Sequence, residues 1–393
     1  MNQARTGAAG PRTGQGPLCA MVAGEASGDL LAGILMQGLQ ARWPTLKTCG
    51  IGGPSMVARG LDAWWPADAL AVRGYVEVLR HYRGIVAIRR QLKARLLRLA
   101  PDVFVGVDAP DFNLDLERDL KQAGIKTVHF VSPSVWAWRA ERLAHIRSSA
   151  DHVLCLFPFE PALLQAHGVA ATYVGHPLAG VIPMHSDRQG ARRALGLPQD
   201  VHVVALLPGS RASEIKYLAR RFLGAAALLR RDRPTLRFVL PAVPALLETL
   251  TGMVQAAGLA DAVQVLAGQS HLALAACDVT LIASGTATLE AALFKRPMVI
   301  AYNMHWLSWQ ILRRQRLQPW VGLPNILCRE FVVPELLQDA ATPAAMAAEV
   351  GRWLDNPGSV DALAHRFTRL HEELSRDTAR LATDAIAQVL HRA

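Results

Sequence analysis

Short apolar segments alternate with helical segments along almost the whole chain, and this alternation constrains the fold more than any other feature. In the first half, strands are predicted at Leu18–Val22, Val103–Val107, Thr127–Val131, His152–Leu156 and Thr172–Val174. In the second half, strands are predicted near Val201–Leu207, Arg237–Leu240, Ala262–Leu266, Val279–Ile282 and Met298–Tyr302. Repeated strand–helix units predict parallel sheets with helices on both faces.

The chain is long enough for two such sheets. Its 393 residues exceed the usual size of one domain, and a polar stretch at residues 185–189 separates the two series of strands. We therefore expect an α/β protein of two Rossmann-like, doubly wound domains, at residues 17–195 and 196–393, that face a cleft. Whether the last helices return to the N-terminal domain or to a partner stays open. Residues 1–16 are expected to form a disordered extension.

Charge and cysteine usage narrow the class of protein. The formal net charge is +10, which attracts anionic lipid, phosphorylated substrates or nucleic acid. Nucleic acid ranks last, because no recognised binding pattern for it is present. No apolar run reaches the roughly 18–20 residues of a membrane-spanning helix, and the N-terminal tail lacks the apolar core of a signal peptide. The five cysteines are scattered without a C-x-x-C pair, which fits a cytoplasmic protein without structural zinc.

Two segments are candidates for contact with a membrane surface. Arg80–Leu99 has apolar residues at helical spacing with basic residues between them. Such a helix either packs on a core with a solvated basic face or contacts a membrane surface or a lipid substrate. The second candidate combines tryptophans with a basic cluster, at Trp306, Trp309, Arg313, Arg314 and Arg316.

Two turns in the second half are suited to bind a diphosphate. Pro208-Gly209 ends an apolar strand, and Ser210 and Arg211 stand just before a helix. A helix that begins there offers backbone N–H groups to an anion, and Arg211 adds a planar set of donors. The stretch Ser284-Gly285-Thr286 repeats the arrangement, with Glu290 placed to accept from ribose hydroxyls. Taken alone, the second turn would be interpreted as ordinary helix capping, with Thr286 and Glu290 as helix residues, but together with Pro208–Arg211 it favours a nucleoside diphosphate.

Three loops in the first half follow strands and carry polar or aromatic residues. Glu25, Ser27 and Asp29 lie on a short glycine-containing loop that suits substrate binding, although a plain strand–helix turn with Asp29 as the helix cap is the alternative. Asp108 ends a buried strand before Pro110 and is placed to act as a general base, although an aspartate at a strand end is about as often a helix cap. Asp111 is expected to cap the next helix. Aromatic residues at Trp136 and Trp138 contact substrate or belong to the core, and His129 is expected to be a core histidine. The role of His176 stays open.

Six segments, in this order, resemble the lipid-A-disaccharide synthase family. They are Ala-Gly-Glu-Ala-Ser-Gly-Asp (23–29), Gly-Val-Asp-Ala-Pro-Asp-Phe-Asn (106–113), Val-Ser-Pro-Ser-Val-Trp-Ala-Trp-Arg (131–139), Leu-Leu-Pro-Gly-Ser-Arg (206–211), Ala-Ser-Gly-Thr-Ala-Thr-Leu-Glu (283–290) and Leu-Pro-Asn-Ile-Leu (323–327). The string at 131–139 is specific, whereas the turns at 208–211 and 284–286 occur more widely among nucleotide-sugar enzymes.

The resemblance implies a glycosyltransferase of the GT-B fold that joins UDP-2,3-diacylglucosamine to 2,3-diacylglucosamine 1-phosphate with inversion. The implied products are the β-1,6-linked tetraacyl disaccharide 1-phosphate of lipid A biosynthesis and UDP. The family acts at the inner face of the cytoplasmic membrane of Gram-negative bacteria, without a metal or other cofactor. It also forms a dimer by exchanging C-terminal segments, which the sequence here leaves open.

Carried over by motif, the resemblance assigns the catalytic base to Asp108 and gives Asn325 a functional role. The expected diphosphate contacts are Arg211, Ser284, Gly285 and Thr286, and the expected ribose contact is Glu290. Further substrate contacts are expected at Glu25, Ser27, Asn113, Ser132, Trp136 and Arg329. Members often have Gly-Arg-Glu after the Leu-Pro-Asn stretch; here Cys328 replaces that glycine, which puts only the glycine's role in doubt.

Two other functions stay open from sequence alone. A UDP-sugar 2-epimerase shares the two-domain plan and would act on UDP-N-acetylglucosamine without any lipid. A peripheral membrane protein could bind a nucleotide sugar without converting it. No Asp-x-Asp sequence occurs in the chain, and a metal-dependent diphosphate site needs carboxylate ligands. We therefore expect a metal-independent reaction in which Arg211 and helix termini neutralise the leaving group.

Overall fold

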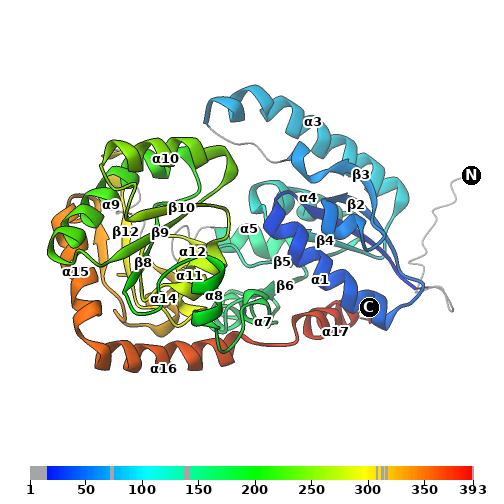
Figure 1. Ribbon diagram of the computed structural model, residues 1–393. Helices are drawn as coiled ribbons and strands as arrows, with labels where there is room; N and C mark the ends of the chain where they lie inside the picture. The colour runs from blue at the N-terminus through cyan, green and yellow to red at the C-terminus, as the bar shows by residue number, and fades with distance from the viewer. Residues whose placement is uncertain are drawn as a thin grey trace, which may run out of the picture. The chain divides into compact units, whose positions relative to one another are not determined.

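A computed structural model describes residues 16–70, 75–136, 142–306, 309–310, 314 and 317–391 of the chain. The chain divides into two compact units, each built on one parallel sheet (Figure 1). Unit 1 runs to Pro177 and also contains the C-terminal segment from Arg376, and unit 2 spans Leu178–Ser375. The sequence-based division after residue 195 had placed residues 178–195 in the first domain.

Unit 1 is a doubly wound sheet in the order β3-β2-β1-β4-β5-β6-β7. Its strands are β1 (Leu18–Ala23), β2 (Lys47–Gly52), β3 (Asp62–Pro66), β4 (Val103–Val107), β5 (Lys126–Phe130), β6 (His152–Cys155) and β7 (Ala171–Tyr173). Its helices are α1 (Ala26–Arg42), α2 (Pro54–Val57), α3 (Tyr75–Leu99), α4 (Pro110–Gln122), α5 (Arg142–Ser149), α6 (Glu160–Gln165) and α17 (Thr378–His391), with a 3₁₀ turn at Ala67–Ala69.

Residues of one strand alternate between two cores, as the two-residue period of a strand requires. Cys19 and Met21 of β1 belong to the core under α1 and α17. Ala20 and Val22 of the same strand belong to the core under α3 and α4. Both faces of the sheet are therefore buried, which is why its strands are almost continuously apolar.

Helix α3, the expected basic amphipathic helix, is anchored in the second of these cores. Leu92 and Leu96 are fully buried, and two of the basic residues form ion pairs with acids of α4, Arg89 with Asp115 at 2.9 Å and Lys93 with Asp119 at 2.7 Å. This part of α3 therefore confirms the core-packing interpretation of the helix. The side chain of Arg80 lies outside the described ones. Among the described residues, no helix is both long and apolar enough to cross a bilayer.

The C-terminal helix α17 packs in unit 1 on α1. Gly38 makes this close approach possible, because a side chain there would collide with the backbone of Ala379 and with Thr383. Arg42 of α1 forms an ion pair with Asp384 of α17 at 2.9 Å. Ile386 is fully buried in the core shared by the two helices.

Unit 2 repeats the architecture with the order β10-β9-β8-β11-β12-β13. Its strands are β8 (Val203–Leu207), β9 (Arg237–Ala242), β10 (Val263–Ala267), β11 (Val279–Ala283), β12 (Met298–Tyr302) and β13 (Glu335–Leu337). Its helices are α7 (Leu178–Val181), α8 (Arg188–Ala194), α9 (Ala212–Asp232), α10 (Leu247–Ala256), α11 (Ser270–Ala276), α12 (Thr286–Leu293), α14 (Leu323–Cys328), α15 (Pro343–Asp355) and α16 (Pro357–Leu374), with 3₁₀ turns at Pro244–Leu246 and Gln338–Ala340.

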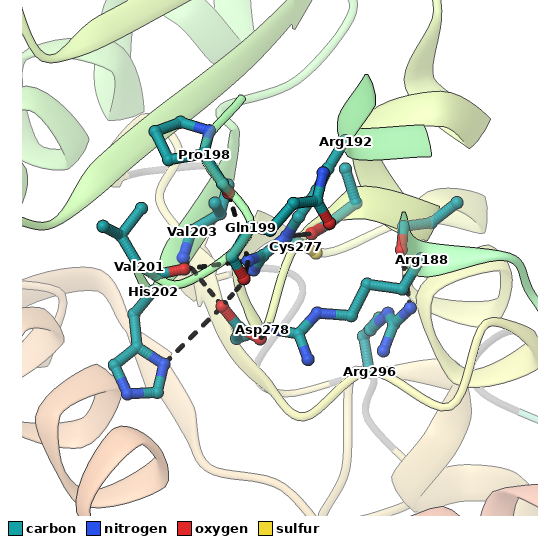
Figure 2. Close-up of polar contacts among 12 residues, drawn as sticks. Arg188, Arg192, Pro198, Gln199, Val201, His202, Val203, Cys277, Asp278 and Arg296 are labelled. Atoms are coloured by element: carbon teal, nitrogen blue, oxygen red, sulfur yellow. Dashed lines mark hydrogen bonds and ion pairs between the residues drawn. The ribbon is translucent and has the colours of Figure 1, made fainter. Parts of the chain in front are cut away.

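A buried arginine joins α8 to the sheet of unit 2. Arg192 is 1% exposed, and its guanidinium donates to the carbonyls of Gln199 and Val201, both at 2.9 Å, and to Asp278 at 2.7 Å. Figure 2 shows the carbonyls gathered around Arg192 and Asp278 beside its guanidinium; Asp278 also accepts from the N–H of Val203 at 2.7 Å. A buried cation needs this full set of acceptors, and the set ties residues 188–194 to the start of β8.

In each sheet the strand order reverses beside the first strand, between β1 and β4 in unit 1 and between β8 and β11 in unit 2. Ligands of open parallel sheets bind beyond the carboxyl ends of the strands at such a switch point. The loops after these four strands are residues 24–25, 108–109, 208–211 and 284–285. They contain several of the residues that the sequence singles out.

Candidate functional site

Two of the expected contacts are exposed at the first switch point of unit 1. Glu25 and Ser27 are solvent-exposed where α1 begins. Asp29 is buried, and its carboxylate accepts from the N–H groups of Gly53, at 2.8 Å, and Ser55, at 2.8 Å. The expectation that Asp29 caps its own helix is therefore wrong; it fixes the loop after β2, because the start of α2 lies against its carboxylate.

The loop after β4 holds Asp108 in an uncommon backbone conformation. Asp108 has φ +52° and Ala109 has φ +44°, both in the left-handed region, which costs free energy for residues other than glycine. The conformation is held on two sides. The N–H of Asp108 donates to Phe130 O at 2.8 Å, and Asn113 Nδ2 donates to Asp108 O at 2.8 Å. Asp108 itself is partly exposed at the carboxyl end of β4.

The expectation that Asp111 caps α4 is wrong. The N-cap residue is Ala109, without a side-chain hydrogen bond, and Asp111 lies in the first turn. The Asp111 side chain is 85% exposed and forms an ion pair with Arg142 at 2.8 Å. Pro110 at the first helical position makes a capping side chain less necessary, because proline fixes the helical φ and has no N–H to satisfy.

Beneath the Asp108 loop lies a buried polar column formed by Asn113, Glu117 and His129. All three are fully buried, and Glu117 Oε1 lies 2.7 Å from His129 Nδ1. Burial raises the pKa of the Glu117 carboxyl, and the neighbouring His129 opposes that change. Asn113 is thus placed behind the loop and not on the surface, so in this structure it holds the backbone of Asp108. His129 lies in the core, as expected.

The aromatic loop after β5 is part of the core. Trp136 is 9% exposed, and its indole N–H donates to Glu160 at 3.0 Å. Its ring packs edge-on against Phe159 and Phe157, at 5.4 and 6.2 Å between centroids. Ser132 is also buried, with its hydroxyl 3.3 Å from Pro133 O. Trp138 and Arg139 lie outside the described residues.

Two titratable groups border this aromatic cluster. Burial raises the pKa of Glu160 to about 8, although Trp136 donates to its carboxylate. Burial lowers the pKa of His176 to about 4, and its ring stacks on Phe157 at 5.7 Å between centroids. His176, whose role the sequence leaves open, is therefore buried as part of this cluster.

The N–H groups of the first turn that was expected to bind an anion in unit 2 are occupied by a side chain of its own helix. Glu214 Oε2 accepts from the N–H groups of Ser210, at 2.8 Å, and Arg211, at 3.1 Å. The expectation that these groups are available to a ligand is therefore wrong for the ligand-free chain. The Arg211 side chain is 77% exposed and reaches Glu214 Oε1 at 3.0 Å.

The second turn is more open. Ser284 N–H donates to Ala301 O at 3.0 Å, and the Ser284 hydroxyl donates to Val321 O at 3.1 Å. Gly285 and Thr286 are exposed, and among the described residues no acceptor lies against the N–H of Thr286 or Ala287. This end of α12 therefore presents backbone donors to solvent at the switch point.

Glu290 has a partner that sequence reasoning missed. His271, at the start of α11 after β10, lies 3.5 Å from Glu290 Oε2. The hydrogen bond to Glu290 raises the pKa of His271, and partial burial opposes that change. The sequence feature that could have indicated His271 is its position just after a strand. Functional side chains of doubly wound sheets lie beyond the carboxyl ends of the strands.

Asn325 is fully buried and bonded to protein groups. Its Nδ2 donates to Val333 O at 2.9 Å and to Glu335 Oε1 at 2.8 Å, and its Oδ1 accepts from Val332 N at 2.9 Å. Asn325 therefore organises the loop around it in the ligand-free chain. Arg329, at the end of α14, is exposed. Within the described residues, no group of three or more His, Cys, Asp and Glu side chains is arranged to hold a metal ion.

Comparisons with known proteins agree with this architecture. A model of the family described as lipid-A-disaccharide synthetase matches residues 19–390. The lipid-A-disaccharide synthase of Albidiferax ferrireducens is 66% identical, over 94% of this chain and 97% of its own. That of Verminephrobacter eiseniae is 63% identical, over 96% of this chain and 98% of its own.

Solved structures are similar in fold at low sequence identity. A putative UDP-N-acetylglucosamine 2-epimerase from Listeria monocytogenes has a TM-score of 0.64 at 10% identity, covering 95% of both chains. A complex of MnaA from S. aureus with UDP has a TM-score of 0.61 at 11% identity, covering 94% of both chains. With a family match over nearly the whole length and two close relatives of the same name, the chain belongs to the lipid-A-disaccharide synthase family, enzymes of lipid A biosynthesis with the two Rossmann-like domains of the GT-B glycosyltransferase fold.

Proposed function

We propose that this enzyme transfers the diacylglucosaminyl group of UDP-2,3-diacylglucosamine to the 6-hydroxyl of 2,3-diacylglucosamine 1-phosphate. The products are the β-1,6-linked tetraacyl disaccharide 1-phosphate and UDP. Family membership supports this choice of reaction. The observation that carries it is the pair of switch points: one ends in a carboxylate, Asp108, and the other in exposed donors, at Thr286.

Unit 2 binds the donor in this proposal. The N–H groups at the start of α12 and the guanidinium of Arg211 receive the diphosphate, because aligned peptide dipoles and a charged donor favour an anion at this place. Glu290 accepts from the ribose hydroxyls. Two proteins of similar fold support a uridine nucleotide, since one is described as a UDP co-structure and the other, from Anabaena, as a complex with UDP and glucose.

Unit 1 supplies the base. The Asp108 carboxylate takes the proton of the acceptor 6-hydroxyl, and the oxygen forms a bond to the anomeric carbon from the face opposite UDP. The bond between that carbon and the diphosphate oxygen breaks, and its electron pair leaves with UDP. Inversion follows from this single displacement. General-base catalysis contributes on the order of 10²–10⁴-fold, and donors directed at the developing charge contribute on a similar scale.

Both substrates carry acyl chains, so the enzyme meets them at the inner face of the cytoplasmic membrane as a peripheral protein. The candidate contact is the segment around Trp306, which is 65% exposed, and Arg314, which is also exposed. Trp309 is partly buried, and Arg313 and Arg316 lie outside the described residues. Helix α3 is the weaker candidate, because its described basic residues include two in ion pairs with α4.

The deciding experiment measures UDP release from UDP-2,3-diacylglucosamine with and without the acceptor. The proposal requires release that depends on 2,3-diacylglucosamine 1-phosphate and a disaccharide product. Conversion of UDP-N-acetylglucosamine in the absence of lipid would indicate a 2-epimerase instead, as some relatives in fold are named. Binding of UDP-sugar without turnover under any of these conditions would indicate a binding protein.

A further inference from the structure

Glu335 presents a carboxylate to hydrogen-bond donors from one loop and one helix. Its Oε1 accepts from Gly322 N at 2.9 Å and from Asn325 Nδ2 at 2.8 Å. Its Oε2 accepts from Val321 N at 3.0 Å. Glu335 is the first residue of β13, the strand at one edge of the unit 2 sheet.

The strand fixes where this carboxylate lies. Ile300 of β12 pairs with Glu335 in register, and the N–H of Ile300 donates to Pro334 O at 3.0 Å. Gly322 approaches both residues so closely that a side chain there would collide with the Ile300 side chain and press on Glu335. Glycine at this position therefore lets the loop close over the edge of the sheet.

The loop held by Glu335 in turn contacts the open turn at α12. Val321 donates its N–H to Glu335 and accepts through its carbonyl from the Ser284 hydroxyl, at 3.1 Å. Ser284 is fixed on its other side by the hydrogen bond from its N–H to Ala301 O. The N–H and the carbonyl of Val321 thus connect Glu335 to Ser284, the residue that precedes Gly285 and Thr286.

We propose that Glu335 is a positioning residue for the nucleoside-diphosphate donor, acting through Val321 on the Ser284–Thr286 turn. This inference rests on the proposed function of that turn. Glu335 itself need not touch the ligand. Donors stabilise an anion best when they are held in place and do not have to reorient as the anion binds. Glu335 holds the loop at Val321 and Gly322 in place from the edge of the sheet.

The hydrogen bonds that Glu335 accepts are best made by a carboxylate. The three groups that face Glu335 are all donors, two backbone N–H groups and the Asn325 amide nitrogen. A glutamine has one acceptor oxygen and an NH₂ group, so its amide nitrogen would face at least one donor. An aspartate keeps two acceptors but is one methylene shorter. Glu335→Gln should therefore release the loop more than Glu335→Asp does.

The test compares UDP affinity by calorimetry and steady-state kinetics in full-length variants. Loss of a hydrogen bond to a charged group predicts UDP binding about 10- to 100-fold weaker in E335Q, with an intermediate loss in E335D. The KM for the donor should rise by a similar factor, while the KM for the acceptor stays unchanged. E248Q makes the same charge change on the exposed start of α10 and should match the unchanged protein.

A double-mutant cycle separates positioning from general stability. If Glu335 acts through Ser284, E335Q should add little to the loss of UDP affinity already caused by S284A. Additive losses, or unchanged UDP affinity in E335Q despite a lower melting temperature, would overturn the proposal. Wild-type UDP affinity in S284A would instead refute the assignment of the turn itself, so the two failures are distinguishable. If E335Q does not fold, E335D in the same cycle carries the test.

Discussion

Glu214 and Arg211 are bonded to each other twice: Glu214 Oε2 accepts from the Arg211 N–H at 3.1 Å, and Glu214 Oε1 accepts from its guanidinium at 3.0 Å. An internal carboxylate thus occupies the Arg211 guanidinium that the proposed function offers to a diphosphate, together with the neighbouring backbone N–H groups. A phosphate that approaches these groups competes with Glu214 for them and is repelled by its charge.

This competition predicts that Glu214→Gln binds UDP several-fold more tightly than the unchanged protein. Glutamine keeps one acceptor for the helix N-terminus but removes the negative charge, so capping is partly retained while repulsion is lost. Calorimetric titration with UDP measures the change. Arg211→Ala is the paired control with the opposite expected effect. It should bind UDP about 10- to 100-fold more weakly, because a charge-assisted bond to the diphosphate is lost. Weaker binding in E214Q would instead mean that Glu214 orients Arg211 for the ligand.

Asp108→Asn should lower kcat by about 10²–10⁴-fold and leave the affinity for UDP unchanged, because the asparagine cannot take a proton and the nucleotide is assigned to unit 2. Disaccharide formation and calorimetry give the two quantities. Asp111→Asn is the matched control: it removes an acid three residues away that is 85% exposed and paired with Arg142. A greater loss of kcat in D111N than in D108N would indicate that Asp111, and not Asp108, is the base.

The sequence predicted the architecture well, because the strands at the centre of each sheet are buried on both faces and therefore read as apolar runs. Three strands at or next to one edge of each sheet were missed, whereas β7 and β10 at the opposite edges were predicted. β2 contains two glycines and a lysine, β3 ends in a proline, and β13 has three residues. Each is too short or too polar for the periodic signal to separate it from a loop. The strand of Glu335 is among those missed, and so was its role.

The candidate site was predicted in outline and less well in detail. Motif spacing placed Asp108, Ser284 and Thr286 at strand ends, since strand ends are local features of the sequence. Which polar atoms are already bonded is a property of the folded chain. Asn113 and Asn325 are buried with protein partners, and Trp136 is covered by phenylalanines, none of which a motif reveals.

Chelation should leave the reaction rate unchanged. The chain has no Asp-x-Asp sequence, and the leaving diphosphate is assigned to the donors of α12 and to Arg211, which need no cation. Disaccharide formation is measured after dialysis against EDTA and again with added Mg²⁺. A loss of activity on dialysis that Mg²⁺ restores would show that the charge of the diphosphate is neutralised by a metal.

Association with anionic vesicles should depend on Trp306. Trp306 is 65% exposed, and basic residues follow it in the sequence, a combination that favours the interface of a bilayer. Sedimentation with phosphatidylglycerol vesicles should fall several-fold in Trp306→Ala and on raising the salt concentration. Val243→Ser removes an exposed apolar residue, 37% exposed, from a stretch, residues 238–270, that contains no Lys or Arg, and should have no effect. Equal sedimentation of W306A and the unchanged protein would place the contact elsewhere.

The pair of His271 and Glu290 predicts a pH-dependent contribution to stability. Because the hydrogen bond to Glu290 raises the pKa of His271 in the folded state, protonated His271 stabilises the fold. That contribution is fully present below the unfolded pKa of about 6.5, and it is lost as the pH rises through the higher folded value. For a pair this exposed it amounts to about 1 kcal/mol or less.

Urea unfolding at pH values from about 5.5 to 9 gives the free energy of unfolding of the unchanged protein and of His271→Gln. The contribution of His271 is the difference between their two curves of free energy against pH. The variant should be less stable at the acidic end of this range, and the difference should shrink toward the alkaline end. Gln cannot gain a proton, so any pH dependence common to both proteins arises elsewhere and cancels. A difference that stays constant with pH would mean that His271 contributes only packing, and one that grows with pH would mean that the neutral ring is the form the fold prefers.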